Sequence, residues 1–349
     1  MFSYTVKSIL SSLVVLTMVV VLITSIIYSS PVDPTRLTFG QRMDEKTVEL
    51  KRKQLGLDLP LNKQIILYLS DISPISITDA VRWEELPFSG FVLMSFEKNK
   101  LVMKMPYLRE SFQTGRSVSS ILFSALPNTL VLALLSIIIA AFLGIVLGTI
   151  SSLVKGSIWD DVILSFSTLG YSVPSYVSAM AFALIFAFYW RAYTGLNLQG
   201  SLWELDDFGN EVMVWQNVIL PCMALSIRPV AVITQLMRNS MNEVADLPFI
   251  KALRAKGISS YKLTVKHMVR NALNPVVTAL SGWFASLLTG AFFVEYVFSY
   301  KGLGYTTINA LLNFDIPVVL GAILLSASFF ILINLAIDFI YKYLDPRIV

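Results

Sequence analysis

Long intervals without a charged residue are the feature that most constrains this chain. A bilayer core about 30 Å thick is crossed by roughly 20 apolar residues in a helix. The charge-free intervals of at least this length are Ser8–Val32, Ser117–Val154, Val162–Trp190, Asn271–Val294 and Ile316–Ile337. Only 14% of the residues are charged, against about 25% in ordinary soluble domains. The sequence therefore predicts an all-α integral membrane protein.

A sixth interval, Met213–Met237, is interrupted by Arg228, which stands between Pro221 and Pro229. We interpret this interval as a further span, so the prediction is about six transmembrane helices. A charge inside a span is functional by default. Two interpretations of Arg228 stay open: it lines a translocation pathway, or it pairs with a lipid headgroup near the inner face.

The first span, within residues 1–30, has the position of a secretory signal peptide. Its apolar core of about 20 residues is longer than the usual 7 to 15 of such a peptide. The nearest approach to a cleavage site is Ser29, Ser30 and Pro31. We therefore expect a retained transmembrane helix.

The charges of the short loops predict the orientation in the membrane. The loop Arg238–Arg270 carries seven basic residues and two acidic ones, whereas Arg191–Glu211 carries one basic residue and four acidic ones. Short loops rich in lysine and arginine stay in the cytoplasm. Alternation then places both termini in the cytoplasm and residues 31–125 outside, followed by a five-helix core over residues 126–349.

The external segment has the pattern of a small cap of mixed structure. Asp44–Leu57 has helical spacing of apolar residues, and Pro60 follows its end. Gly90–Met105 contains two strand-like runs around Glu97–Lys100, which predicts a β-hairpin.

The titratable composition excludes several classes of protein. Cys222 and His267 are the sole cysteine and histidine, so the chain cannot form an internal disulfide or a His-rich metal site, and an intramembrane enzyme is poorly supported. The sequence has no G-x-x-x-x-G-K-[ST] phosphate loop, so ATP hydrolysis would need another chain. The net charge of +4 comes from basic residues that cluster beside the spans, which does not favour a nucleic-acid partner.

The basic loop Asn242–Pro275 is the most informative segment. Pro248 stands near the start of a predicted short helix, and Gly257 supplies the left-handed residue that ends it. A second helix would follow, with Ser259 or Ser260 as its N-cap. The first helix has an apolar stripe and a basic face, formed respectively by Leu247, Ile250 and Leu253 and by Lys251, Arg254 and Lys256. Such a helix can dock in a groove of a cytoplasmic partner.

The order of residues in this loop resembles the coupling ("EAA") loop of ABC importer permeases, in the form found in their peptide branch. The residues that carry the resemblance are Lys251, Ala252, Leu253, Arg254, Ala255, Lys256, Gly257, Lys266, His267, Arg270, Asn271, Ala272, Leu273 and Pro275. Lys251 and Leu253 depart from the general pattern, which has an acidic and a small residue there. On charge alone, the alternative is a loop that anchors topology and binds anionic headgroups. Docking or structure is the expected role of His267, rather than acid–base chemistry.

The resemblance extends over most of the chain. Further matching segments are Ser30–Pro34, Gln54–Leu61, Tyr107–Val118, Leu126–Leu130, Val297–Phe298, Gly302–Gly304 and Leu344–Arg347. Residues 71–104 do not match, and their role is not readable from the sequence. Gly144 and Gly148 form a small-xxx-small step in the second span, which favours close helix packing.

The resemblance implies a type I ABC importer-like permease in the bacterial cytoplasmic (inner) membrane. The implied partners are a second homologous permease, two cytoplasmic ABC ATPase subunits and an extracytoplasmic solute-binding protein. The chain itself is expected to bind no cofactor, with ATP and Mg on the ATPase subunits. Peptide is the expected solute. Nickel or another small solute is an alternative within the same branch, and an ATP-independent secondary transporter is an alternative from a different class.

Overall fold

The computed structural model describes residues 2–28 and 58–344. The chain divides into two compact units. Unit 1 comprises Met1–Ala125 and Thr306–Ile331, and unit 2 comprises Leu126–Tyr305 and Leu332–Val349. The predicted helix at Asp44–Leu57 lies outside the described residues.

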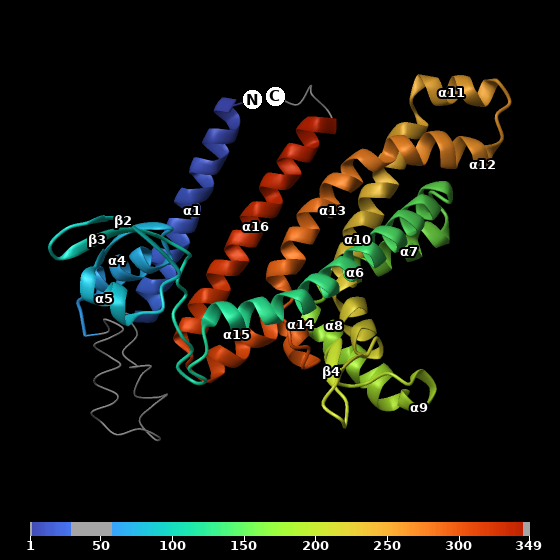
Figure 1. Cartoon of the computed structure of the whole chain (residues 1–349). Coiled ribbons are helices and arrows are strands. Elements are labelled where there is room, and N and C mark those ends of the chain that lie inside the picture. The colour runs from blue at the N-terminus through green and yellow to red at the C-terminus, as the bar shows by residue number, and fades with distance from the viewer. Residues whose placement is uncertain (1, 29–57, 345–349) are drawn as a thin grey trace. The chain divides into compact units, whose positions relative to one another are not determined.

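Unit 1 combines membrane-type helices with a small mixed α/β cap (Figure 1). Its elements are α1 (Phe2–Tyr28), α4 (Leu61–Ile72), β1 (Ile75–Asp79), α5 (Ala80–Glu85), β2 (Gly90–Ser95) and β3 (Asn99–Lys104), with the first turns of α6 (Val118–Leu153), most of α15 (Leu303–Leu312) and the first half of α16 (Ile316–Leu344).

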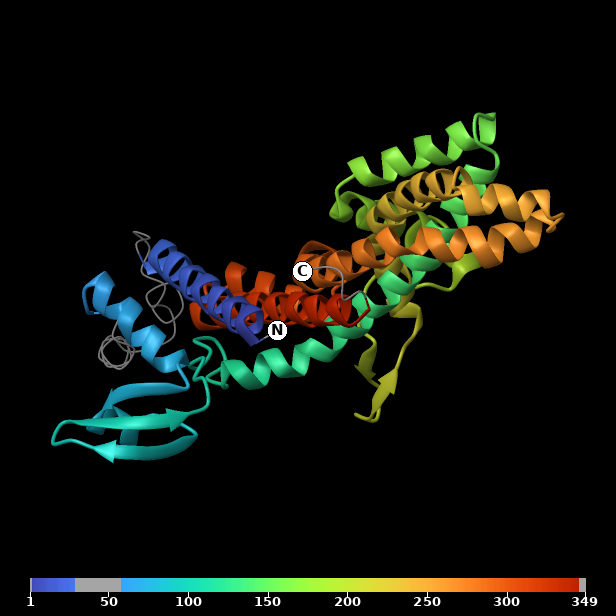
Figure 2. The same ribbon diagram turned by 90° about the horizontal axis from the view of Figure 1, so that it is seen from above.

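The three strands of the cap form an antiparallel sheet in the order β1-β3-β2. Ile75 pairs with Met103, and Gly90 pairs with Lys104. Figure 2 shows the strands side by side, with α4 next to them. The hairpin predicted at Gly90–Met105 is confirmed, because β2 and β3 pair as antiparallel neighbours on either side of a short turn.

A buried ion cluster ties the cap together. The carboxylate of Asp71, only 1% exposed, accepts hydrogen bonds from Arg82 at 2.9 Å and from Arg109 Nη2 at 3.0 Å. The ammonium of Lys104 lies 3.9 Å from the centre of the Phe88 ring, and burial lowers the pKa of this lysine. The cluster joins α4, α5 and the segment after β3, so residues 71–104 fold as part of the cap.

Unit 2 contains the largest part of the helical chain. Its elements are α7 (Ile158–Ser172), α8 (Ser175–Phe182), η1 (Ala183–Tyr189), α9 (Arg191–Thr194), β4 (Trp203–Leu205), β5 (Glu211–Met213), α10 (Gln216–Ala245), α11 (Pro248–Ala255), α12 (Ser260–Lys262), η2 (Leu263–Val269), α13 (Arg270–Gly290) and α14 (Phe292–Val297), with most of α6, the start of α15 and the end of α16.

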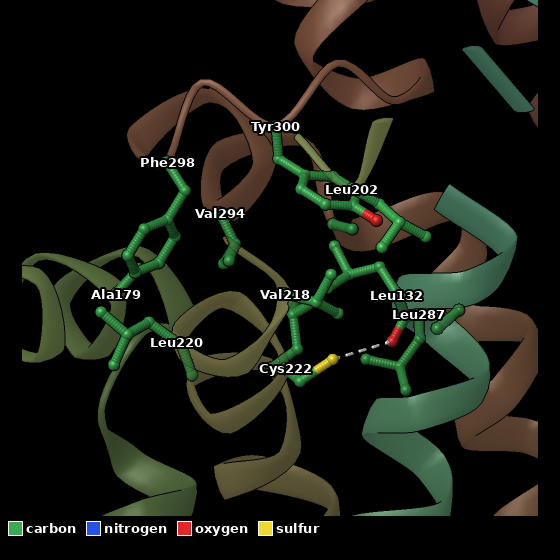
Figure 3. Close-up of a cluster of buried hydrophobic side chains, with 14 of the residues drawn as sticks. Leu132, Ala179, Leu202, Val218, Leu220, Cys222, Leu287, Val294, Phe298 and Tyr300 are labelled. Carbon is green, nitrogen blue, oxygen red and sulfur yellow. Dashed lines mark hydrogen bonds between the residues drawn. The ribbon is translucent and has the colours of Figure 1, made fainter. Parts of the chain in front are cut away.

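The first core of unit 2 is an apolar cluster drawn in Figure 3. Leu132 of α6, Val218 and Leu220 of α10 and Val294 of α14 meet in it, below the buried rings of Phe298 and Tyr300. Cys222 is buried here, and its thiol donates to the carbonyl of Leu132 at 3.7 Å. The cysteine therefore has a packing role.

Close packing of α6 on α10 depends on the two glycines singled out above. A Cβ atom at Gly144 would lie 2.6 Å from Ile233 Cγ2, and one at Gly148 would lie 2.5 Å from the carbonyl oxygen of Thr234. No larger residue fits these positions without moving a helix, so the small-xxx-small step serves packing as predicted.

Three helices are long and apolar enough to cross a bilayer: α6, α10 and Ile316–Ala336 of α16. They agree with three of the predicted spans and support a membrane location. Among the described residues, α1 contributes a shorter apolar stretch, Leu10–Ile26, and α13 does not meet the same criteria. The total of six spans stays a prediction.

The predicted span Val162–Trp190 is broken in the structure. α7 and the continuous pair α8 and η1 meet the span criteria together but are bent by 105°. Val173 has an extended backbone (φ −78°, ψ 127°) and precedes Pro174, whose ring disfavours helical geometry in the preceding residue. The proline explains why the apolar interval does not form one straight helix.

Candidate functional site

The predicted coupling loop lies at one end of unit 2. α11 and α12 are found where α10 and α13 end, and β4 lies towards the other end of α10 (Figure 1). The basic loop and the acidic segment Arg191–Glu211 are thus on opposite sides of this unit, as the charge pattern predicts.

Ile250 fixes α11 to the body of unit 2. Its side chain is fully buried in an apolar cluster with Met237 and Met241 of α10, Leu263 and Met268 of η2 and Val276 of α13. Leu253 packs at the edge of the same cluster, whereas Leu247, also predicted to belong to the apolar stripe, is 41% exposed. The cluster joins α11 to both helices that flank the loop.

The turn after α11 has the geometry predicted from Gly257. This glycine has φ 76°, and its N–H donates to the carbonyl of Arg254 at 3.0 Å. The N–H of Ile258 donates to the carbonyl of Leu253 at 3.4 Å. These two bonds form a Schellman motif, in which a residue with a side chain would be strained at the glycine position. Pro248 occupies the first turn of α11. Ser259 is the N-cap of α12, but its side chain makes no capping hydrogen bond.

The remaining residues of the first half of the loop face away from the core. Exposed side chains belong to Lys251, Ala252, Arg254, Ala255 and Lys256. Two aromatic residues that the sequence reading did not single out share this exposure: Phe249 is 41% exposed and Tyr261 is 79% exposed. Residues that anchor interfaces are enriched in aromatic types. Two aromatic residues within a basic loop were therefore a sign of an interface that the sequence already contained. The surface of α11 and α12 combines cationic groups with two aromatic rings.

The second half of the loop continues into α13. Lys266 and Arg270 are exposed, and His267 is partly buried. The side chain of Asn271 donates to the carbonyl of His267 at 2.6 Å, which supports the end of η2. Pro275 lies inside α13. Among the described residues, no group of three histidine, cysteine or acidic side chains is placed to hold a metal ion.

An ion pair missed by the sequence reading braces the helix that leads into the loop. Arg238 of α10 donates to both carboxylate oxygens of Asp160 at the start of α7, at 2.8 and 2.7 Å. Asp160 also accepts from the hydroxyl of Ser151 and the N–H of Gly156. The bidentate geometry sets the distance and angle between α7 and α10 just before the loop begins.

A second missed contact joins two segments that the sequence reading matched separately. The hydroxyl of Thr129 donates to the Glu295 carboxylate at 2.7 Å, and Asn128 donates to the carbonyl of Lys301 at 2.8 Å. The N–H of Leu303 donates to the Thr129 hydroxyl at 2.8 Å, so the Leu126–Leu130 and Gly302–Gly304 segments are in direct contact.

Arg228 lies in the middle of α10 beside α7. Its guanidinium carbon is 5.4 Å from the centre of the Tyr171 ring. Its Nε atom is buried without a hydrogen-bond acceptor among the described residues. Arg228 does not contact the predicted residues of the coupling loop. It therefore belongs to a separate location.

Comparison with known proteins bears on the whole chain. Residues 142–349 match the model of the family described as "binding-protein-dependent transport system inner membrane component", and residues 1–133 match the N-terminal model of such membrane components. A similar protein is the "Oligopeptide transport system permease protein OppB" of Haemophilus influenzae, 34% identical over 235 residues that cover 67% of this chain and 72% of that one.

A second relative aligns over nearly the full length. It is the "Probable peptide ABC transporter permease protein y4tP" of Sinorhizobium fredii, 27% identical over 99% of this chain and 98% of that one. Among solved structures, the inward-facing MetNI methionine ABC transporter contains a chain that superposes with a TM-score of 0.52 at 17% identity, covering 65% of this chain and 97% of that chain. The last likeness is one of fold alone.

Proposed function

The chain belongs to the family of binding-protein-dependent transport system inner membrane components, and from this premise we propose that it is the permease subunit of an ATP-driven peptide importer. The names of two relatives, an oligopeptide permease and a probable peptide permease, support the choice of solute. Peptide would move inward across the bacterial cytoplasmic membrane by alternating access, and the permease would perform no covalent chemistry on it.

The observation that carries this proposal is the construction of the loop between α10 and α13. α11 and its C-cap residue present Lys251, Arg254 and Lys256 outward, while Ile250 holds α11 on the core. In our proposal, this surface seats in a groove of a cytoplasmic ATPase, in the helix-in-groove mode. A displacement of α11 by the ATPase would move α10 as well, because the side chain of Ile250 on α11 packs against the end of α10.

The Asp160–Arg238 pair extends this coupling into the membrane helices. Because two parallel hydrogen bonds hold α7 to the end of α10, a movement of α10 carries α7 with it. The unit would then respond to ATP binding on the partner as a largely rigid body. This transmission is the step that converts ATP binding into a change of access.

The proposed assembly includes the subunits that an ATP-driven importer needs besides this chain. No phosphate loop is present, so two separate ABC ATPase subunits would bind ATP and Mg. A second homologous permease would complete the pathway, and an extracytoplasmic solute-binding protein would deliver peptide. With the basic loop in the cytoplasm, both termini would lie there as well.

The test is substitution of Gly257 by valine in the assembled transporter. A β-branched residue is strained at φ 76°, so the turn after α11 should reorient. We expect loss of ATP-driven peptide uptake by proteoliposomes and loss of co-purifying ATPase. Gly209→Val is the matched control, because Gly209 has φ 80° and open space around it, as Gly257 does, but lies in the β4–β5 turn. Wild-type uptake and co-purification in Gly257→Val would overturn the proposal.

A further inference from the structure

Arg228 places a charge near the middle of α10, a helix long and apolar enough to cross a bilayer. It stands twelve residues after Gln216, the first residue of α10, which corresponds to roughly 18 Å along the helix. α10 continues for 17 residues beyond Arg228 to Ala245, so Arg228 lies at least about three helical turns from either end of α10. Over the interval Met213–Met237, Arg228 is the only charged residue.

The guanidinium lacks an internal counter-charge. Among the residues that the structure describes, no carboxylate lies within 4.0 Å of it, and its buried Nε has no acceptor. Two other buried or half-buried arginines differ from Arg228 in this respect. Arg238 pairs with Asp160, and Arg109 pairs with Asp71. The contact of Arg228 is the face of Tyr171, which holds the cation in place but does not neutralise it.

An unpaired charge near the middle of a membrane-type helix calls for an anion from outside the described chain. Ionisable groups inside membrane spans face the protein interior or a water-filled cavity and mark solute pathways. A lipid phosphate is not the expected partner, because headgroups lie at the ends of a spanning helix and Arg228 lies near the middle of α10. α7 and α10 run side by side (Figure 2), and Tyr171 on α7 is 50% exposed, so the described chain does not fully enclose the Arg228–Tyr171 pair.

This inference rests on the proposed function: we infer that Arg228, assisted by the hydroxyl of Tyr171, binds the C-terminal carboxylate of a peptide in transit. A carboxylate is common to all peptides with a free C-terminus, whatever their side chains. The planar guanidinium can donate two parallel hydrogen bonds to it. An isolated guanidinium repels Ni²⁺, so the same geometry favours an anionic solute over a free metal ion.

The test compares two peptides of identical sequence, one with a free C-terminus and one with a C-terminal amide. Uptake is measured in proteoliposomes that contain the complete transporter and its binding protein, and each variant is compared with wild type for the same peptide. Peptide concentrations are set so that the wild-type complex takes up both. This normalisation removes any preference of the binding protein from the comparison.

For Arg228→Gln, we expect uptake of the free peptide to fall about tenfold or more, as for loss of one partner of a desolvated charge pair. Uptake of the amidated peptide should stay within about twofold of wild type. Arg228→Lys, which keeps the charge but loses the bidentate fork, should fall between the two for the free peptide. Tyr171→Phe keeps the ring and should reduce free-peptide uptake by a smaller factor.

Two outcomes would overturn this assignment. Equal losses for both peptides would show a structural role or a pair with a carboxylate of another subunit, and no loss for either would show that Arg228 does not meet the solute. Co-purification of the ATPase and its basal activity are measured in the same preparations. If these remain at wild-type levels while the peptide pattern fails, only the Arg228 inference falls, and the coupling proposal stands on the Gly257 experiment.

Discussion

Thr129 donates a hydrogen bond of 2.7 Å to Glu295 across 166 positions of the chain. The same hydroxyl oxygen accepts from the N–H of Leu303, and the other carboxylate oxygen of Glu295 accepts from Gly304 and Tyr305. Glu295 is fully buried and caps the first turn of α15 from a distance. One carboxylate thus joins the early part of α6 to α14 and α15.

Thr129→Val should destabilise the protein while preserving its shape. Valine has nearly the volume of threonine but leaves the buried carboxylate one donor short, so we expect a loss of about 1–3 kcal/mol and a lower Tm in detergent. Thr168→Val is the matched control, since the exposed Thr168 hydroxyl bonds the carbonyl of Leu164 in its own helix. Equal Tm values for Thr129→Val and wild type would contradict the role of this contact.

The stability of the protein should depend on the protonation of Glu295. Burial is the main cause that raises the pKa of this carboxyl from 4.5 to about 7. The folded state therefore holds the proton more tightly than the unfolded state, and stability should decrease as pH rises between about 4.5 and 7. At 1.36 kcal/mol per pKa unit, the full effect is about 3 kcal/mol.

The measurement for this pH dependence is Tm from pH 5 to pH 8 for wild type and Glu295→Gln. Glutamine keeps an acceptor oxygen but does not titrate, so the slope attributable to position 295 should disappear. Parallel curves for the two proteins would refute the assignment of the titration to Glu295.

Asp160→Asn should weaken the attachment of α7 to α10. Arg238 would keep a mostly buried guanidinium without its anionic partner, at a cost of about 3 kcal/mol. The neighbouring Asp161→Asn is the control, because Asp161 is exposed on the same helical turn. In thermal denaturation, the double variant Asp160→Asn, Arg238→Gln should lose less than the sum of the single variants. Additive losses would argue against direct coupling between the two residues.

Tyr261→Ala should weaken binding of the ATPase without affecting the fold. The ring is 79% exposed in isolation, so its removal leaves Tm unchanged. Truncation of an aromatic anchor at an interface commonly costs about 2 kcal/mol or more, which corresponds to at least about tenfold weaker binding. Tyr193→Ala, at a 91% exposed tyrosine of α9, serves as the control. Unchanged affinity in a pull-down titration of the ATPase would remove Tyr261 from the interface.

Several features could be predicted because they depend on local sequence. The length of an apolar interval sets whether a helix can cross a bilayer, and α6, α10 and α16 follow it. α11 starts at Pro248 and ends just before Gly257. Both limits follow from the dihedral angles that proline and glycine favour, which act within about one helical turn. The hairpin of β2 and β3 likewise follows from two strand-like runs separated by a short turn.

Other features required the tertiary structure. The 105° bend between α7 and α8 follows a proline that the sequence displays, but apolar composition alone does not distinguish a straight span from a broken one. Ile250 and Leu247 belong to the same apolar stripe, yet the fold buries one and exposes the other, because only Ile250 faces the ends of α10 and α13.

The chain by itself therefore determined that α6, α10 and α16 are apolar enough to enter lipid and where the loop between α10 and α13 turns. These properties arise from hydrophobicity and backbone geometry over a few consecutive residues. The tertiary structure decided which polar groups meet: Asp160 pairs with Arg238 across 78 positions, Glu295 accepts a hydrogen bond from Thr129 across 166, and Arg228 has no described carboxylate beside it. Whether a polar group has a partner depends on distances in space, which the order of residues along the chain does not specify.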